Sequence, residues 1–416
     1  MAHRTFDRSP WRLAPDISFL NHGSFGACPD PVLEAQRAWR DRMEAEPVRF
    51  LDRELEGHLD AARAEVAAFL GADADGLAFV PNATTGVSTV LSSLRFTPGD
   101  ELIAGDHEYN ATLNALRAAA ARDGASVTLV HVPFPVADPS QVVDAYLAAL
   151  TPRTRLALVS HVTSPTALVL PVTALVRELD RRGVDTLVDA AHAPGMLPLD
   201  LTALGAAYWT GNAHKWLCAP KGAAMLHVRA DLRDRIRPLV ISHGANEARR
   251  DRTRYRLAFD WTGTADPTPY LAIPAAIRFV AGLHPDGWSG LMAANGVKAL
   301  AARDRLCEAL RIPSPAPDGM LGSMAAIPLP GVAPTREAAA RLATSLFDEE
   351  RIEVPVYPFP VPAALAPGAS PAAAIIRISA QHYNRPDEYE ALAASLARRL
   401  KTASSPRSLL GRLRRG

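Results

Sequence analysis

Two short segments decide the fold and the chemistry of this chain: TLVDAAH at residues 186–192 and GNAHKW at residues 211–216. The first begins as an apolar run and ends in Asp189, the pattern of a buried strand that leads into a polar loop. The second follows a strand-like run at 206–210 and contains Lys215, whose apolar and aromatic neighbours are unlike those of a solvated lysine. Both groups would therefore lie at the carboxyl ends of strands, where ligands of open α/β sheets collect.

Around these segments, short apolar runs alternate with helix-like segments from about residue 60 to residue 280. The runs expected to be buried strands are 77–80, 101–104, 127–130, 156–159, 186–189 and 223–226. The alanine-rich segments with helical spacing between them include 111–122, 141–150 and 172–182. This alternation predicts an α/β fold, with right-handed crossovers and a mostly parallel sheet covered on both faces.

The rest of the chain predicts a second, smaller α+β unit. It should contain a helix at 290–311, a strand at 374–378 and a closing helix at 386–400. We expect four parts: an N-terminal segment packing with the small domain, a large domain, the small C-terminal domain, and a basic, flexible tail. Their expected boundaries are 1–55, 56–283, 284–402 and 403–416.

Composition narrows the possible partners. The net charge of +1 gives no basic field for nucleic acid, and 48% apolar residues with 21% charged is typical of a globular enzyme. The cysteines, Cys28, Cys218 and Cys307, have neither paired nor metal-type spacing, which fits a reducing compartment. No apolar run reaches the length of about 18–20 residues that spans a membrane. We expect a cytoplasmic protein with no nucleic-acid partner, no membrane partner and no metal site.

Lys215 and Asp189 together indicate pyridoxal phosphate chemistry. That cofactor most needs a lysine that forms a Schiff base and an acid that keeps the ring nitrogen protonated. A structural salt bridge is the competing interpretation of Asp189. His192 could hydrogen-bond the ring hydroxyl or merely fill a gap, and Asn212 and His214 could add phosphate donors.

A phosphate site is also indicated by PNATTG at 81–86, between the strand at 77–80 and a helical segment. Free backbone N–H groups, the helix dipole and the hydroxyls of Thr84 and Thr85 would converge there. The competing interpretation is an N-capping threonine without a ligand.

Two further positions are candidates for contacts with a ring and with a substrate. In DHEYN at 106–110, either His107 or Tyr109 could stack on a cofactor, while metal binding by adjacent side chains is a poor alternative. Arg377 lies inside an apolar strand, where a guanidinium needs an anion. That anion could be a substrate carboxylate or a structural partner. Dinucleotide, P-loop, nucleophile-elbow and CxxC motifs are absent from the sequence.

Taken together, these segments resemble the class V aminotransferase family of fold-type I pyridoxal phosphate enzymes, and within it the isopenicillin N epimerase-like branch. The resemblance runs from about residue 19 to residue 400. Its motifs are FLNHGSFG (19–26), NATT (82–85), HEYN (107–110), SHVTSPT (160–166), DAAH (189–192), GNAHKW (211–216), APKG (219–222), WTGT (261–264), RISA (377–380) and YN (383–384).

The resemblance implies a seven-stranded-type large-domain sheet and a homodimer with shared active sites. Lys215 would carry the cofactor, Asp189 would bind its ring nitrogen and His192 would lie near its ring oxygen. The expected phosphate and cofactor contacts are Thr84, Thr85, Thr163, Asn212, His214 and, from the other subunit, Thr264. The expected substrate contacts are Asn21, His22, Phe25 and Arg377.

The resemblance also implies a reaction at the α-carbon of an amino-acid-like substrate, with epimerisation or racemisation first and a β-eliminating C–S lyase second. The second base of an epimerase is open between His22 and Tyr109. Cysteine desulfurases carry a nucleophilic cysteine before the carboxylate-binding arginine, and residues 354–371 here contain none. A non-catalytic, cofactor-binding sensor is a third interpretation, but the short segment before residue 19 leaves no room for an attached DNA-binding domain.

Overall fold

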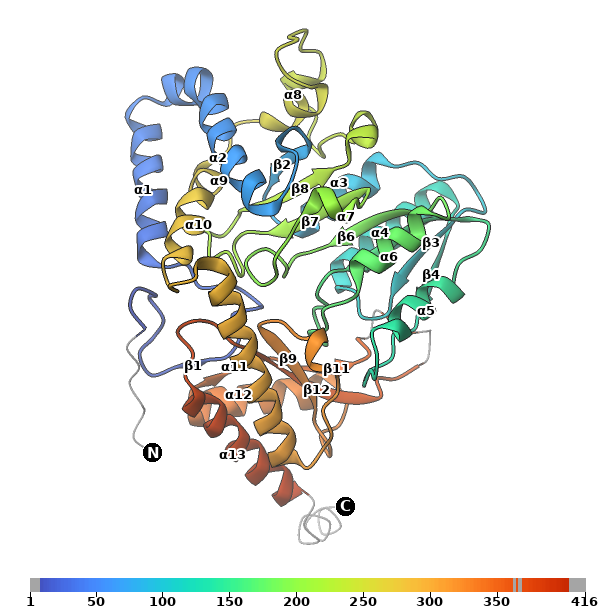
Figure 1. Ribbon diagram of the computed structural model, residues 1–416, viewed down its shortest axis with the longest axis vertical. Helices are drawn as coiled ribbons and strands as arrows, with labels where there is room; N and C mark the ends of the chain where they lie inside the picture. Colours follow the sequence, from blue (N-terminus) through green and yellow to red (C-terminus); the bar gives the residue numbers. More distant parts are fainter. Residues whose placement is uncertain (1–7, 362–363, 366–368, 404–416) are drawn as a thin grey trace.

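The larger part of the protein is built on one mostly parallel sheet, shown in Figure 1, a computed structural model that describes residues 8–361, 364–365 and 369–403. The strand order is β2-β8-β7-β6-β5-β3-β4, and β8 alone runs antiparallel to its neighbours. The bounds are β2 Leu77–Val80, β3 Glu101–Gly105, β4 Ser126–Val130, β5 Thr154–Ser160, β6 Asp185–Asp189, β7 Tyr208–Asn212 and β8 Ala224–Val228. The predicted α/β fold with a mostly parallel sheet is confirmed.

Helices cover both faces of this sheet, as alternating side chains on single strands show. On β5, Leu158 packs in a core with residues of α3 and α4, whereas the next residue, Val159, packs in a separate core with residues of α5 and α6. The helices of this part are α2 Leu55–Leu70, α3 Ala83–Ser93, α4 Asn110–Asp123, α5 Ser140–Ala148, α6 Val172–Asp180, α7 Leu201–Leu204 and α8 Arg254–Asp260. Short 3-10 turns occur at Ala74–Gly76, Ala230–Arg235 and His243–Ala245.

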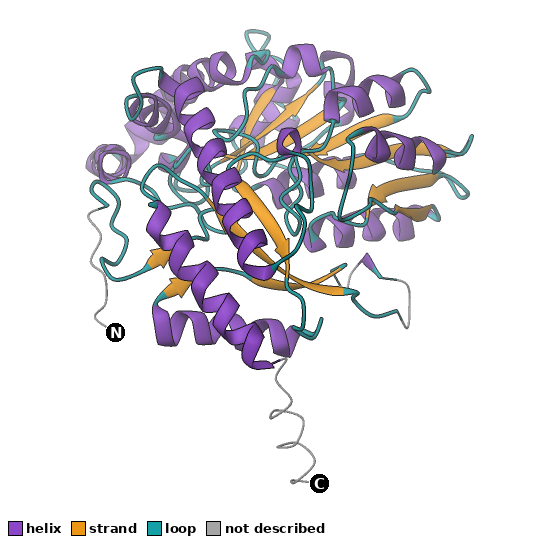
Figure 2. Cartoon of the chain, turned by 60° about the horizontal axis from the view of Figure 1, so that its bottom comes forward, coloured by secondary structure: helices purple, strands orange, loops and turns teal. Residues whose placement is uncertain are grey.

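The smaller part is an antiparallel sheet in the order β11-β12-β9, with its own core. Figure 2 turns this part toward the viewer, with its purple helices packed beside its orange strands. Its elements are α11 Gly287–Leu310, β9 Met324–Pro328, α12 Arg336–Glu350, β11 Val356–Phe359, β12 Ala373–Ser379 and α13 Pro386–Ala403, with a 3-10 turn at Asp318–Met320. Pro358 is tolerated in β11 because this strand is at an edge and pairs with β12 on one side.

The N-terminal segment contacts both parts. Strand β1 (Ser18–Phe19) pairs in parallel with β10 (Ile352–Glu353) of the smaller part. Helix α1 (Asp30–Ala45) instead packs against α9 (Thr268–Leu271) and α10 (Ile273–Ala281) beside the large sheet, and a π-helical turn at Arg49–Glu54 joins it to α2. The expected packing of 1–55 with the small domain therefore describes β1 but not α1.

The predicted domain boundaries stay predictions, and residues 404–416 of the expected basic tail lie outside the described part. Over the described residues, none of the helices combines the length and apolarity needed to cross a bilayer.

Candidate active site

The site is formed where β6 and β7 end side by side. Asp189 is the last residue of β6 and pairs with Thr210 of β7, and the loop after β7 carries Lys215. A cavity of about 340 Å³ opens over this edge of the sheet. The predicted site residues that line it are Phe25, Thr84, Tyr109, Asp189, His192, Asn212, His214 and Lys215. The parallel register therefore brings the two deciding segments of the sequence to one cavity.

Lys215 and His192 form the centre of the site. Lys215 Nζ lies 3.1 Å from His192 Nε2. Burial lowers the pKa of Lys215 to about 7, and the positive charge of Arg377 acts in the same direction while Asp189 opposes it. Burial also lowers the pKa of His192 well below its usual value, so that the imidazole is neutral. Lys215 is thus a lysine whose amine is substantially neutral at physiological pH.

The Asp189 carboxylate is buried and faces the cavity without an ion-pair partner in the described part of the chain. One of its oxygens accepts a hydrogen bond from the backbone N–H of Ala191 at 3.0 Å. Burial raises the pKa of Asp189, and the Ala191 hydrogen bond and the Lys215 charge oppose that rise. The structural salt bridge weighed for Asp189 is not seen, and the donor that this acid lacks is what a protonated ring nitrogen supplies. The Asp189 carboxylate therefore fits the protonated ring nitrogen of pyridoxal phosphate.

At the predicted phosphate end, the helix α3 begins with its cap on Asn82. The Asn82 side-chain oxygen accepts from both the N–H and the hydroxyl of Thr85, at 2.8 and 3.1 Å. Thr84 faces the cavity, whereas Thr85 lines a neighbouring hollow, so Thr85 does not line the cavity as expected. The physical reason is that Asn82, not a threonine, caps the helix and turns Thr85 inward.

Two more cavity residues are fixed by the backbone around them. Asn212 Oδ1 accepts from the N–H of Ala83 at 2.8 Å, and His214 Nδ1 lies 3.0 Å from the carbonyl of Ala223. The Asn212 amide NH₂ remains for an anion, with the Thr84 hydroxyl beside it. His214 Nδ1 donates to the Ala223 carbonyl, and burial lowers the pKa of His214 to about 4, so Nε2 of the neutral ring is an acceptor. This donor set suits the phosphate of the cofactor.

Of the two candidate stacking residues, Tyr109 lines the cavity and His107 does not. Tyr109 is 49% exposed at the start of α4. His107 is buried, its Nδ1 lies 2.8 Å from the hydroxyl of Thr166, and its ring packs edge-on against Phe359. Thr163 shares the Thr166 hydroxyl at 2.8 Å. His107 and Thr163 therefore pack together through Thr166, and neither lines the cavity.

Arg377, on β12, has no carboxylate ion pair among the described residues. Its terminal nitrogens donate to the carbonyl of Ser164 and, at 2.8 Å, to the hydroxyl of Ser24, while its buried Nε has no partner in the described structure. Both serines line the lysine cavity. The structural ion pair weighed for Arg377 is thus not observed, and its guanidinium fits an incoming carboxylate.

The remaining substrate-side candidates differ in position. Phe25 is 76% exposed on the rim of the cavity. Asn21 does not line it, and instead accepts from the Ser24 hydroxyl at 2.6 Å. His22 is fully buried under the lysine loop, with Nε2 3.0 Å from the Lys215 carbonyl and Nδ1 2.8 Å from the Tyr383 hydroxyl. Both ring nitrogens of His22 are thus occupied, and the residue does not line the cavity.

Sequence reasoning missed one acid in the wall of the site. Glu108 is buried, and its oxygens accept from the N–H of Ser160 at 2.8 Å and from the Ser160 hydroxyl at 2.5 Å. Burial raises the pKa of Glu108 to about 8, with Asp189 contributing, so the acid is largely neutral at pH 7. Glu108 directly precedes Tyr109 in the sequence, and no metal-type cluster of side chains occurs among the described residues.

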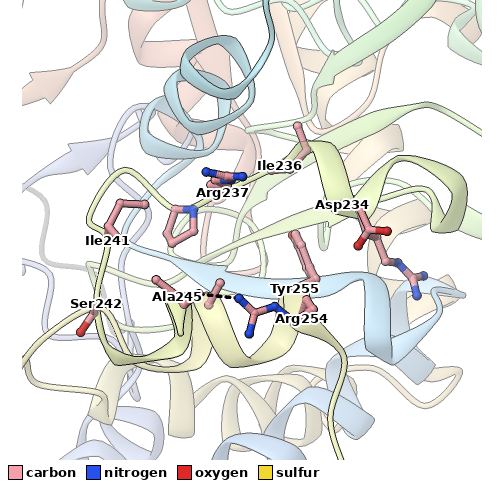
Figure 3. Close-up of a pocket in the computed structure, with 11 residues that line it drawn as sticks. Asp234, Ile236, Arg237, Ile241, Ser242, Ala245, Arg254 and Tyr255 are labelled. Atoms are coloured by element: carbon pink, nitrogen blue, oxygen red, sulfur yellow. Dashed lines mark hydrogen bonds between the residues drawn. The ribbon is translucent and has the colours of Figure 1, made fainter. Parts of the chain in front are cut away.

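A second hollow lies away from this chemistry, beside α8 (Figure 3). Arg254 donates there to the carbonyls of Ala245 and Glu247. Asp234 is the acid of its lining, which includes neither Lys215 nor Asp189. Thr264 is exposed and lines neither this hollow nor the lysine cavity of its own chain.

The fold and the site define a fold-type I enzyme of pyridoxal phosphate chemistry, and comparison with known proteins agrees. The aminotransferase class V family model matches residues 26–286. The chain is 38% identical to the isopenicillin N epimerase of Amycolatopsis lactamdurans over 92% of this chain and 95% of that one. It is 32% identical to a probable chloroplastic L-cysteine desulfhydrase of Arabidopsis thaliana over 91% of this chain and 82% of that one.

Among solved structures, a cysteine desulfurase of Escherichia coli superposes with a TM-score of 0.76 at 21% identity, covering 95% of this chain and 98% of that one. At this identity the likeness concerns the fold alone. The chain belongs to the class V aminotransferase family, whose members depend on pyridoxal phosphate, and it is an enzyme of that family.

Proposed function

We propose that this protein is an epimerase or racemase that inverts the α-carbon of an amino-acid-like substrate. The observation that carries the proposal is the neutral amine of Lys215 in a cavity whose lining residues Ser24 and Ser164 accept hydrogen bonds from the buried guanidinium of Arg377. The 38% identity to the isopenicillin N epimerase of Amycolatopsis lactamdurans supports inversion, and residues 354–371 lack a cysteine that could accept sulfur.

The roles of the side chains follow from their positions. Lys215 would hold the cofactor covalently, Asp189 would stabilise its ring cation, and Thr84 and Asn212 would bind its phosphate beside His214. Bound pyridoxal phosphate supplies an electron sink that acidifies the α-hydrogen of an amino acid. Arg377 would bind the α-carboxylate, with Ser24 holding the guanidinium in place and Asn21 holding Ser24.

Inversion also needs two proton-transferring groups on opposite faces of the α-carbon. Lys215, once its amine is free, is the base for one face because its lowered pKa keeps it neutral near pH 7. Of the two candidates for the other face, Tyr109 presents its side chain to the cavity and His22 does not. We therefore assign the second face to Tyr109.

A β-eliminating C–S lyase is the second candidate, because L-cysteine desulfhydrases are also relatives at 32% identity. Elimination uses the same Lys215 base but needs no group on the opposite face. Replacement of Tyr109 by Phe therefore distinguishes the two functions. It should abolish inversion while leaving elimination largely intact.

The test is exchange of the α-hydrogen in heavy water over a panel of amino acids, with chiral analysis of the recovered material and a pyruvate assay on cysteine. Deuterium in both enantiomers supports the epimerase. Deuterium in one enantiomer alone together with pyruvate release would overturn it in favour of the lyase.

We further propose a homodimer in which Thr264 completes the site of the other subunit. The segment Leu239 to Ile241 leaves three large apolar side chains exposed, and Leu239 and Val240 share a hollow with Thr85 and Gly263. Mixing Lys215→Ala with Thr264→Ala protein should restore activity through one repaired site per mixed dimer. A monomer in sedimentation analysis, or no restoration, would contradict this.

A cytoplasmic location fits the unpaired, buried state of all three cysteines.

A further inference from the structure

Another hollow, of about 350 Å³ and distinct from the one beside α8, adjoins the lysine cavity and shares Tyr109 and Ser164 with it. One wall comes from β11, through Val356 and Pro358, and the opposite wall comes from Ala339 of α12. These walls are apolar and buried. The hollow is therefore a side chamber into which a ligand in the lysine cavity can extend past Tyr109 and Ser164.

Positively charged groups stand at the two ends of this chamber. At the near end, the Arg377 guanidinium donates to Ser164 and lies 5.6 Å from the ring centroid of Tyr357, which lines the chamber. At the far end is Arg336, the first residue of α12, which makes no ion pair with the described residues. Thr335 caps this helix by accepting from the N–H of Ala338 at 3.2 Å, and Glu337 is the acid of its first turn.

One acid, Glu108, contributes to the chamber lining, and it does not oppose this positive field at neutral pH. Both of its oxygens are engaged by Ser160, and burial raises its pKa to about 8, so it is largely uncharged. Glu337, the neighbour of Arg336 on α12, is not part of the lining. An anion in the chamber would therefore meet Arg336 as its charged partner.

We propose that this chamber is the side-chain subsite of the enzyme and that it selects amino acids with a second anionic group at the end of an apolar stem. Arg377 binds the α-carboxylate, the stem lies between Pro358 and Ala339, and Arg336 binds the distal anion. The inference rests on the proposed function, because it places the α-carbon at Lys215. A small substrate such as cysteine would leave both the apolar walls and Arg336 unused.

The test uses the cofactor-loaded enzyme and follows the absorbance of the bound cofactor during titration with L-alanine, L-norleucine, L-aspartate, L-glutamate, L-2-aminoadipate and L-2-aminopimelate. Three proteins are compared: the unaltered enzyme, Arg336→Gln and Arg341→Gln. Arg341 is the matched control, because it is an exposed arginine of the same helix that does not line the chamber.

We expect one of the longer dicarboxylic amino acids to bind more tightly than norleucine. Arg336→Gln should raise its Kd by about threefold to tenfold, the range for a partly solvated charge pair, and leave the Kd of alanine unchanged. Arg341→Gln should change neither value. Arg336→Glu should reverse the preference, so that L-lysine binds better than the dicarboxylic ligand.

The failures can be told apart. If alanine and norleucine bind but no dicarboxylic ligand depends on Arg336, the subsite is wrong and the proposed function stands. If no amino acid perturbs the bound cofactor, the proposed function is wrong and the subsite falls with it.

Discussion

The Nζ of Lys215 lies 3.1 Å from Nε2 of His192, and the proton between them belongs to the imidazole. The indole N–H of Trp216 can only donate, and it points at His192 Nδ1 at 3.4 Å, so Nδ1 accepts. The neutral imidazole therefore carries its proton on Nε2 and donates to the lone pair of a neutral lysine. This hydrogen bond holds the amine at the cavity, and the lone pair must leave His192 Nε2 before it can attack an aldehyde.

The first prediction concerns pH. Because burial lowers the pKa of Lys215 to about 7, the attacking neutral amine predominates above that pH and is lost below it. The rate at which apoenzyme recombines with pyridoxal phosphate should thus rise with pH through about 7 and level off. Pyridoxine phosphate, which lacks the aldehyde, is the control and should bind without this step. A rise centred near the ordinary lysine value of about 10.4 would contradict the account.

The charges around Lys215 give a second prediction, with opposite signs for two substitutions. Arg377 lowers the lysine pKa and Asp189 raises it. Arg377→Gln should therefore move the midpoint of the recombination profile upward, and Asp189→Asn should move it downward, each by about one pH unit. Shifts of the same sign, or none, would show that these groups do not act on the amine through their charges.

A third prediction concerns the close approach of the N-terminal segment to the lysine loop. A Cβ on Gly26 would lie 2.5 Å from the Lys215 carbonyl oxygen and 2.6 Å from that of His214, both backbone atoms. Gly26→Ala should cost about 1–3 kcal/mol of unfolding free energy and weaken cofactor binding, because the loop must move.

The matched control is Gly57→Ala in α2, where no atom lies within 4 Å of an added Cβ. It should stabilise the protein by about 0.5–1 kcal/mol, since alanine favours the helix. Chemical denaturation and cofactor titration measure both effects. Equal behaviour of the two variants would remove the proposed role of Gly26.

The sequence predicts much of the central sheet, because buried strands appear in it as apolar runs. It also predicts the placement of Asp189 and Lys215, because the carboxyl ends of parallel strands meet at the same edge of a sheet. It does not predict which side chains face the cavity. Thr85, His107 and His22 turn away because Asn82, Thr166 and Tyr383 engage them, and those partners are set by loop conformation. The packing of α1 on the large sheet likewise depends on contacts with α9 and α10 that are distant in sequence.

The central claim is that Lys215 is the residue joined to the cofactor. Borohydride reduction of the cofactor-loaded protein followed by peptide mass spectrometry measures this directly, with Lys221→Ala as the control for a lysine close by on the same segment. We predict a cofactor adduct on the Lys215 peptide in the unaltered and Lys221→Ala proteins, and no adduct in Lys215→Ala. An adduct on Lys221, or an adduct that survives in Lys215→Ala, would contradict the account.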